Sequence, residues 1–186
     1  MSETTSIAWS ERRIAAYLAR VTFTHKALVM VPRCSWTGNE CDLLVVTQNL
    51  RIIDVEVKIS RADLRADAMK EKWFHAWDWK IDGPMRDRKA PRRPRQWPHR
   101  VWKHYYCLPR DIWRPELFEA IAPVSGVLLM DHDHEGRFFV RCERMARPDR
   151  GAEKITAEDA IDIARLASFR MWDSFDEVER LKGVAA

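Results

Sequence analysis

The segment from Ile52 to Ile59 constrains the fold most, because it alternates apolar and charged side chains with a period of two. Successive side chains of a β-strand point to opposite faces of a sheet. The odd-numbered positions therefore form one apolar face, whereas Asp54, Glu56 and Lys58 share the other. An edge strand could expose these charges to water as a salt-bridge ladder. A strand in the core would have to pair them or use them to hold a metal ion.

A predicted hairpin brings a further carboxylate to the charged face. The apolar run Cys41–Thr47 indicates a second strand, and a loop of residues Gln48–Leu50 would join it to the strand that begins at Arg51. With this loop length, Asp42 falls directly opposite Glu56, whereas a slip of one residue would turn it to the other face. Directly opposed residues have Cβ atoms about 5 Å apart. Two carboxylates at that distance repel unless a cation lies between them.

These residues predict a hard-metal site for Mg²⁺ or Mn²⁺. Its expected ligands are Asp42, Glu56 and the backbone carbonyl of Val57, with open positions for water. Such an ion lowers the pKa of bound water and stabilises charge on a scissile phosphate. Lys58 would orient the attacking water or neutralise the developing charge. Asp42, Glu56 and Lys58 are therefore the candidate catalytic residues.

Helical and strand patterns alternate along the chain and predict one α/β domain over residues 1–186, with a central mixed sheet flanked by helices. The expected helices are Ser10–Arg20, Arg61–Trp77, Arg114–Ile121 and a C-terminal helix over about residues 156–181. The expected strands are Ala27–Pro32, Cys41–Thr47, Arg51–Ile59, Tyr105–Leu108, Val124–Met130 and Arg137–Cys142.

Composition and cysteine spacing bear on the compartment. The chain is 46% hydrophobic and 32% charged, with a net charge of +4, which is a mild bias toward polyanions. No apolar run approaches the roughly 20 residues that span a bilayer, and residues 1–5 lack the features of a secretory signal. The four cysteines are far apart, without a CxxC pair, and are expected to be buried free thiols. We therefore expect a cytoplasmic protein without a membrane partner.

A basic segment rich in Pro, Arg and Trp interrupts the pattern over about residues 81–104. Its prolines exclude a regular helix or a central strand. It could be a disordered, solvated loop, or its cations and indole rings could neutralise phosphates and stack on bases. The residues that we predict to contact DNA here are Arg88, Arg92, Arg93, Arg95, Trp97, Arg100, Trp102 and Lys103.

The arrangement of Asp42 on one strand, Glu56-Val57-Lys58 on the next, and a helix immediately afterwards resembles the signature of the PD-(D/E)xK nuclease superfamily. The resemblance implies a restriction-endonuclease-like core and metal-dependent hydrolysis of phosphodiesters. That superfamily often has an acidic residue on its first helix. Glu11 and Glu40 are therefore further candidate ligands.

A narrower resemblance covers about residues 7–147. The sequence EVKISRADLRAD at residues 56–67, the Lys72-Trp73 pair and YYCLP at residues 105–109 are similar to the MmcB-like family of DNA repair proteins. This resemblance implies a role on DNA and favours phosphate contacts for Arg61 and Lys72. In that family the Lys-Trp pair leads quickly into the aromatic strand, whereas here the basic segment intervenes and leaves the substrate or partner open.

The motif and the two resemblances are compatible with two functions. The first is a metal-dependent DNA nuclease that acts in repair or processing. The second is a DNA-binding or assembly protein that keeps the nuclease fold and does not cleave. The sequence does not separate single-stranded DNA, duplex or branched DNA, and RNA. Duplex cleavage in this superfamily often uses dimers, so a homodimer is compatible with the first function.

Overall fold

The computed structural model describes residues 9–76, 78–82 and 92–184, and its centre is a six-stranded sheet. The strands are β1 (Ala27–Cys34), β2 (Cys41–Thr47), β3 (Ile52–Val57), β4 (Lys103–Pro109), β5 (Gly126–His132) and β6 (Phe138–Arg144). The α-helices are α1 (Glu11–Tyr17), α2 (Arg61–Asp67), α3 (Trp79–Asp82) and α4 (Ala157–Val184). Shorter helical turns are η1 (Leu18–Thr22), η2 (Glu71–Trp73) and η3 (Pro115–Ala120).

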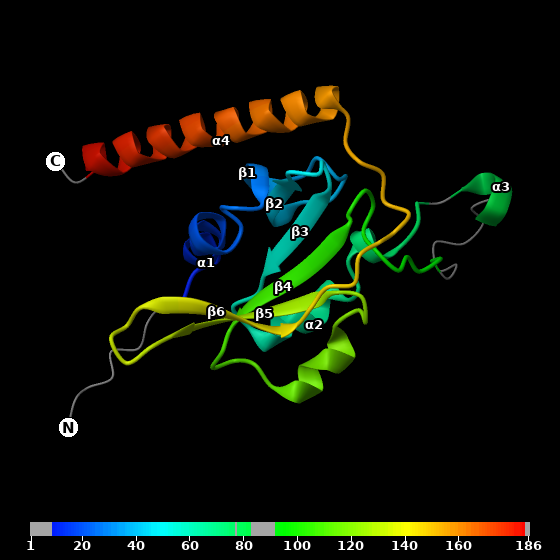
Figure 1. Cartoon of the computed structure of the whole chain (residues 1–186), viewed down its shortest axis with the longest axis horizontal. Coiled ribbons are helices and arrows are strands. Elements are labelled where there is room, and N and C mark those ends of the chain that lie inside the picture. The colour runs from blue at the N-terminus through cyan, green and yellow to red at the C-terminus, as the bar shows by residue number, and fades with distance from the viewer. Residues whose placement is uncertain (1–8, 77, 83–91, 185–186) are drawn as a thin grey trace.

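The strands lie in the order in which they occur in the chain (Figure 1). The pairs β1–β2, β2–β3 and β5–β6 are antiparallel, whereas β3–β4 and β4–β5 are parallel. The expected α/β architecture with a mixed sheet and flanking helices is therefore confirmed. No helix in the described ranges is both long and apolar enough to cross a bilayer.

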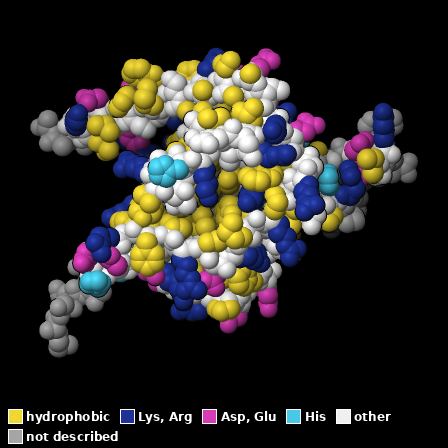
Figure 2. All heavy atoms as spheres, in the orientation of Figure 1, with side chains coloured by type: hydrophobic (Ala, Val, Ile, Leu, Met, Phe, Trp, Pro, Cys, Tyr) yellow, Lys and Arg dark blue, Asp and Glu magenta, His cyan; other side chains and the backbone are white. Residues whose placement is uncertain are grey.

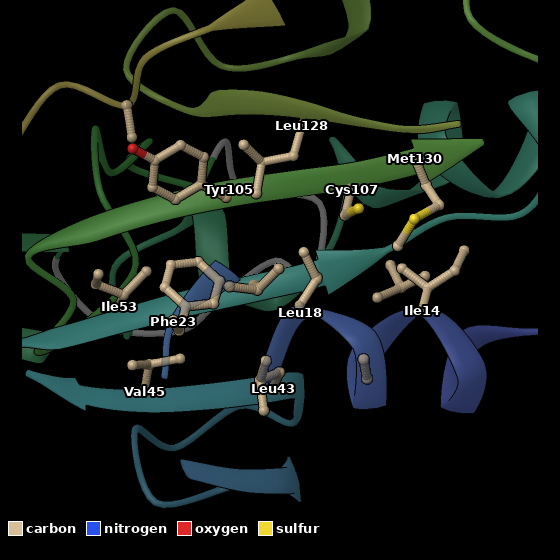
Figure 3. Packing of buried hydrophobic residues seen from close by; sticks show 14 residues of the cluster. Ile14, Leu18, Phe23, Leu43, Val45, Ile53, Tyr105, Cys107, Leu128 and Met130 are labelled. Carbon is tan, nitrogen blue, oxygen red and sulfur yellow. The ribbon is translucent and has the colours of Figure 1, made fainter. Parts of the chain in front are cut away.

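One face of the sheet packs against α1 (Figure 3). Ser10 caps this helix by accepting a hydrogen bond from the backbone N–H of Arg13, as its sequence predicts. Ile14 and Leu18 then lie one turn apart and are fully buried against Leu43 of β2 and other strand residues. Of the odd-numbered positions of the Ile52–Ile59 segment, Ile53, Val55 and Val57 also enter this core, whereas Ile59 is exposed.

The opposite face carries two apolar clusters with a charged region between them. Leu44 and Ile163 belong to the cluster formed with β1 and the start of α4, whereas Leu64 of α2 and Leu108 belong to the cluster under α2 and η3. Asp54 and Glu56 point to this face because they alternate with the residues that face α1. The charged residues of β3 are thus in a covered, central strand, and the edge-ladder alternative is wrong.

The expected helix Arg61–Trp77 is much shorter in the structure. Helix α2 ends at Asp67, and a turn at residues 68–70 leads into η2. This turn carries Lys72 back over the sheet, where it meets buried carboxylates. Propensity alone favours a continuous helix here, but the tertiary ion pairs require the turn.

The basic segment is ordered over the part that is described. The backbone N–H of Arg95 donates to the carbonyl of Trp73, and that of His75 donates to the carbonyl of Arg93. Phe74 and Pro94 form an isolated bridge between the same stretches. Residues 93–95 therefore lie against residues 73–75, whereas Trp97 donates to the carbonyl of Arg147 and the N–H of Trp102 donates to that of Ile52. The disordered-loop alternative does not apply to these residues.

The C-terminal helix agrees with its prediction. Thr156 precedes α4, and its hydroxyl accepts from the N–H of Asp159 while the Asp159 carboxylate accepts from the N–H and hydroxyl of Thr156. These reciprocal hydrogen bonds form a capping box. Helix α4 then runs across the sheet beside β1, past α1 (Figure 1).

Candidate active site

The β2–β3 hairpin has the predicted register. Leu44 pairs with Asp54 and Leu43 pairs with Val55, so the next step of the ladder places Asp42 opposite Glu56. Leu50 closes the three-residue loop with a left-handed φ of 61°. A residue in that conformation commonly ends a loop of this length. The sequence therefore determined correctly which backbone positions meet.

The Asp42 side chain binds the backbone beside Glu56 and not Glu56 itself. Its Oδ2 accepts a hydrogen bond of 2.7 Å from the N–H of Val57. Lys58 donates its own N–H to Cys107 on the β4 side, so the N–H and C=O of Val57 point toward β2. Within the described part of the chain, no hydrogen bond or ion pair joins Asp42 to Glu56 or Lys58.

A cavity of about 410 Å³ opens beside Asp42. It lies among α1, β1 and α4, and Glu11 from the first turn of α1 lines it together with Asp42. Glu11 is exposed, whereas Asp42 is half-buried. The structure thus brings one of the two further candidate ligands to the same cavity as Asp42.

Burial raises the pKa of Asp42 to about 6. The N–H of Val57 opposes this shift, Glu56 and Glu11 add to it, and Lys58 opposes it. Asp42 therefore lies within electrostatic reach of all three charged candidates. A carboxyl group whose pKa is raised by neighbouring carboxylates is one whose ionised form a bound cation would stabilise.

Glu56 and Lys58 form a buried ion pair. Lys58 Nζ lies 2.9 Å from Glu56 Oε2, and both residues are only 3% exposed. Lys58 also lies 3.2 Å from Asp67 Oδ1. Burial would lower the pKa of Lys58, but the carboxylates of Glu56 and Asp67 outweigh it and hold this pKa above its ordinary value. Lys58 is therefore a charged ammonium.

A second lysine completes the network. Lys72 Nζ is 2.9 Å from Glu56 Oε1 and 2.9 Å from Asp67 Oδ2. The Tyr106 hydroxyl donates to the same Asp67 oxygen at 2.5 Å. Burial raises the pKa of Asp67, but Lys72, Lys58 and Tyr106 together lower it below its ordinary value. Asp67 is thus an ionised carboxylate that ties α2 to the sheet.

Asp54 and His104 close the network toward the centre of the sheet. Burial raises the pKa of Asp54 to about 7, and its Oδ1 has no hydrogen-bond partner among the described residues. Burial and then the charge of Lys72 depress the pKa of His104, so His104 is neutral. Its Nε2 lies 3.3 Å from Lys72 Nζ, and its Nδ1 lies 2.9 Å from the hydroxyl of Ser125. Because an ammonium can only donate, the Nε2 atom accepts and the Nδ1 atom carries the proton.

The donor set fits a hard cation in part. No group of three or more His, Cys, Asp or Glu side chains placed to hold a metal exists among residues 9–76, 78–82 and 92–184. Mg²⁺ often takes only one or two carboxylates and fills its other positions with water and phosphate oxygens. Asp42, the nearby carbonyl of Val57 and the exposed Glu11 have that chemistry. Glu56 is already neutralised by two ammonium groups.

Several predicted contacts are corrected. Lys72 is 3% exposed and paired with two carboxylates, so it does not lie on the surface where a phosphate could reach it. Glu40 is exposed before β2 and does not line the cavity beside Asp42. Arg61 is half-buried and donates from Nε to the carbonyl of Ile112 at 2.7 Å. Arg88 lies outside the described residues.

Three of the predicted DNA-binding residues come together at a larger cavity of about 580 Å³. Arg95, Trp97 and Arg100 line it, with Trp36 on its wall and the Arg100 guanidinium 4.8 Å from the centre of the Trp36 ring. Lys154 adds a further cation to the lining.

Acidic residues also line this larger cavity, namely Asp149, Glu153 and Asp159. The carboxylates of Asp149 and Asp159 accept hydrogen bonds from the N–H groups of Gly151 and Thr156. These two carboxylates therefore have local structural partners.

The other basic-segment residues are held elsewhere. Arg92 pairs with Glu71 and Arg93 pairs with Asp82. Trp102 is half-buried against the α1-facing core, and Lys103 lies with its Nζ 4.7 Å from the centre of the Trp102 ring. These four residues do not line the larger cavity, unlike Arg95, Trp97 and Arg100.

Sequence reasoning missed the buried network around Glu56, in which Lys72 binds Glu56 directly. Asp67 and His104 enter the network from α2 and β4, and Lys72 enters from the turn after α2. The available signal was the alternation of His104 and Tyr106 in β4. It becomes informative only once β4 is known to pair with β3, where Asp54 faces His104 and Glu56 faces Tyr106.

Comparisons with known proteins give information about the fold and not about the function. No family model matches this chain, and no curated protein matches it. A solved structure, the SPO1766 protein of unknown function from Silicibacter pomeroyi, is similar to it with a TM-score of 0.54 and 17% sequence identity. The similarity covers 96% of this chain and 97% of that chain. The two proteins therefore share an arrangement of elements over nearly their whole lengths.

Proposed function

We propose that this protein is a metal-dependent DNA nuclease with its active centre at the β2–β3 hairpin. The observation that carries the proposal is the position of Asp42, which binds the Val57 N–H between Glu56 and Lys58 and shares a cavity with Glu11. The β2–β3 register gives this placement the geometry that the Asp42 and Glu56-Val57-Lys58 motif requires. The proposal includes a restriction-endonuclease-like core and membership of the MmcB-like family.

Asp42 and the carbonyl of Val57 would hold Mg²⁺ or Mn²⁺, with Glu11, which lines the same cavity, as a further ligand. When bound, such an ion supplies an activated water and neutralises charge on the phosphate. The chain's own residues contribute a fixed electrostatic environment. Lys58 Nζ and Lys72 Nζ each lie 2.9 Å from a carboxylate oxygen of Glu56, so two ammonium groups pair with this buried side chain.

DNA is the proposed partner, and the larger cavity is its proposed contact. The pKa of His99 at this cavity is lowered by burial and then by Arg95 and Arg100, which indicates a positive local potential. Trp36 and Trp97 offer aromatic rings beside these cations. Cations with aromatic side chains are the combination that holds a nucleic-acid strand. The free, buried thiols of Cys34, Cys41 and Cys107 suit a reducing compartment, so we propose a cytoplasmic location.

One observation favours the second candidate function, a DNA-binding protein that does not cleave. Glu56 and Lys58 are each 3% exposed and neutralise one another together with Lys72 and Asp67. A phosphate could reach Lys58 only if this network opened. In this alternative the motif residues tie α2 to the sheet, and the larger cavity alone contacts DNA.

The test is a cleavage assay on single-stranded, duplex and branched DNA, and on RNA, with Mg²⁺, Mn²⁺ or EDTA. The sharpest variant is Asp42→Asn, because an asparagine can still accept the Val57 N–H and Asp42 is only half-buried. Loss of an outer-shell partner of a metal costs about 10–100-fold, so loss of a ligand should reduce cleavage by at least about 100-fold. Asp131→Asn, at a half-buried aspartate of β5, is the matched control.

A second measurement separates cleavage from binding. Arg95→Ala and Arg100→Ala should each weaken DNA binding and reduce its salt dependence by roughly one counterion, whereas Asp42→Asn should leave binding unchanged. Arg20→Ala, at an exposed residue of η1, serves as the control for charge alone. Unchanged cleavage in the Asp42→Asn variant would refute the catalytic assignment. Weaker binding by the Arg95→Ala and Arg100→Ala variants, with normal binding by Asp42→Asn and no cleavage by the unmodified chain, would support the second function.

A further inference from the structure

Helix α4 presents its largest apolar side chains away from the rest of the protein. Trp172, Phe169 and Phe175 are 58%, 57% and 53% exposed. Ile161, Met171 and Val178 are also exposed. Hydrophobic side chains gather along this helix on the surface of the molecule (Figure 2). An amphipathic helix of a monomer normally turns such residues toward the core.

The side of α4 that contacts the rest of the chain is made of small residues. Ile163 is fully buried, and the partly buried Ala160 and Ala167 pack beside it against the β1 cluster. Ser174 follows on the same side and lines the cavity beside Asp42. The helix therefore contacts the rest of the chain through Ile163, small side chains and the bonds of Arg170 to Arg33 and of Glu177 to Arg12, whereas its aromatic side chains are exposed.

The exposed apolar residues follow a regular spacing. Steps of three and four residues separate Ile161, Ala164, Ser168, Met171 and Phe175, of which only Ser168 is polar. Val178 continues the spacing and also lines the cavity beside Asp42, whereas the exposed Phe169 lies outside this series. Trp172 lies beside this stripe with its ring centre 5.8 Å from that of Phe175. Steps of three and four residues are typical of a helix that packs along its length against another helix.

The charge of α4 excludes polyanions as the partner of this stripe. The helix carries seven acidic and four basic side chains, although the whole chain has a net charge of +4. DNA and anionic lipid surfaces attract basic helices. The stripe therefore suits a protein surface that is apolar and of mixed charge, such as the stripe itself.

The order of charges beside the stripe is self-complementary in one orientation. Asp162, Arg165, Asp176 and Arg180 lie on one flank of the helix, in the order negative, positive, negative, positive. In an antiparallel pair related by a two-fold axis, each flank meets the same flank of its partner. An axis near Met171 then sets Asp162 against the partner's Arg180 and Arg165 against the partner's Asp176. In a parallel pair related by a two-fold axis, each flank meets the opposite flank of its partner, so these four residues would not meet one another.

We propose that α4 forms a homodimer interface, in which the α4 helices of two copies pack antiparallel about an axis near Met171. Such an interface is isologous, as two-fold symmetry requires.

The extent of the stripe is sufficient for a dimer. A fully buried aromatic side chain removes roughly 150–250 Å² from water. Three half-exposed aromatic residues with Ile161, Met171 and Val178 thus offer several hundred Å², of the order of the roughly 800 Å² that each partner contributes to a standard interface. Contiguous apolar patches of that size are uncommon on monomers.

The first test is the molecular mass of the full chain by light scattering during size-exclusion chromatography, with circular dichroism to verify folding. The unmodified chain should be a dimer, and Trp172→Glu/Phe175→Glu should weaken association by at least about 100-fold, since interface aromatic anchors dominate binding energy. The control, Met69→Glu/Ile81→Glu, introduces two charges at residues that are 74% and 66% exposed outside α4 and should remain dimeric. A monomer in the unmodified chain, or a dimer that persists in the α4 variant, overturns the proposal.

Cysteine cross-linking tests the orientation in a Cys142→Ser background, which removes the exposed native thiol. Met171→Cys should cross-link two copies, because it lies near the proposed axis. Ile161→Cys should not, because antiparallel helices would separate the two sites by about 30 Å at 1.5 Å per residue. Charge exchange gives a second check, since Arg165→Asp should weaken the dimer and Arg165→Asp/Asp176→Arg should restore it. Cross-linking at Ile161 and not at Met171 would contradict the antiparallel arrangement.

Discussion

Replacement of Lys72 by methionine tests the buried charge network most directly. Methionine keeps an unbranched stem of similar length but removes the ammonium group. That group lies 2.9 Å from Glu56 Oε1, 2.9 Å from Asp67 Oδ2 and 3.3 Å from His104 Nε2. The Lys72→Met variant would leave Lys58 as the sole buried cation among the described residues that contact Glu56 and Asp67.

The expected loss of stability is large. Removal of one partner from a buried ion pair costs about 3–5 kcal/mol, because the remaining charge stays desolvated. Lys72 contacts two buried carboxylates, so we expect Lys72→Met to lower the free energy of unfolding at pH 8 by about 4 kcal/mol. That is a large share of the 5–15 kcal/mol typical of a domain.

Lys70 provides a matched control because it binds the same aspartate from the surface. Its Nζ lies 2.9 Å from Asp67 Oδ1, but its side chain is 48% exposed. Exposed ion pairs contribute about 0–1 kcal/mol, so Lys70→Met should cost no more than that. Urea denaturation followed by circular dichroism measures both variants under the same conditions.

The dependence of stability on pH tests whether the lost ammonium charge causes the destabilisation of Lys72→Met. Without Lys72, the pKa values of the remaining carboxylates in the folded state should rise. A raised pKa of an acid stabilises the fold at low pH and loses that contribution as pH rises through it. The deficit of Lys72→Met should therefore be smaller at pH 5 than at pH 8. Equal costs for Lys72→Met and Lys70→Met, or a deficit independent of pH, would refute the reasoning.

Three further predictions concern single positions. Burial raises the pKa of Asp54 from its ordinary 3.8 to about 7, so this carboxyl group stabilises the fold less as pH rises through that interval. In urea denaturation, the stability of Asp54→Asn relative to the unmodified chain should therefore increase by on the order of 2–4 kcal/mol between pH 5 and pH 8. A difference that stays constant with pH would contradict this. Gly126→Ala should destabilise the fold by about 1–3 kcal/mol or more in the same assay, because its Cβ would lie 2.2 Å from the Tyr105 ring and 2.7 Å from the Ala146 nitrogen; a neutral effect would mean that β4 can shift freely. Ser10→Ala should lower the thermal midpoint through loss of the α1 cap, about 1 kcal/mol, and an unchanged midpoint would show that the cap contributes nothing.

Local patterns in the sequence predicted much of the sheet and one critical register. The strand Cys41–Thr47 has the expected bounds, and the loop before Arg51 sets Leu43 opposite Val55 as predicted. Both results depend on interactions between residues close in the chain. The end of α2 at Asp67 was not predicted, because its cause is contact with Lys58 and Lys72 and not helix propensity.

The sequence predicted which backbone positions of the candidate site lie opposite one another, but not which groups its side chains contact. The sequence indicated that Asp42 and Glu56 occupy neighbouring positions, and the β2–β3 ladder agrees. It did not indicate that Asp42 would turn to the Val57 N–H, or that Lys72 would bind Glu56. Side-chain rotamers and the cover provided by α2 decide these contacts.

The sequence by itself determined the two faces of β3, since the alternation of apolar and charged residues from Ile52 to Ile59 allows a strand only one division of its side chains. The tertiary structure alone decided that the charged face is buried. It did so by laying β4 parallel to β3 and folding the turn after α2 over both, which brings Lys72 to Glu56 and sets Asp67 and His104 beside the same ammonium group. Burial depends on elements that lie far apart in the chain, and a local pattern carries no information about which of them will cover it.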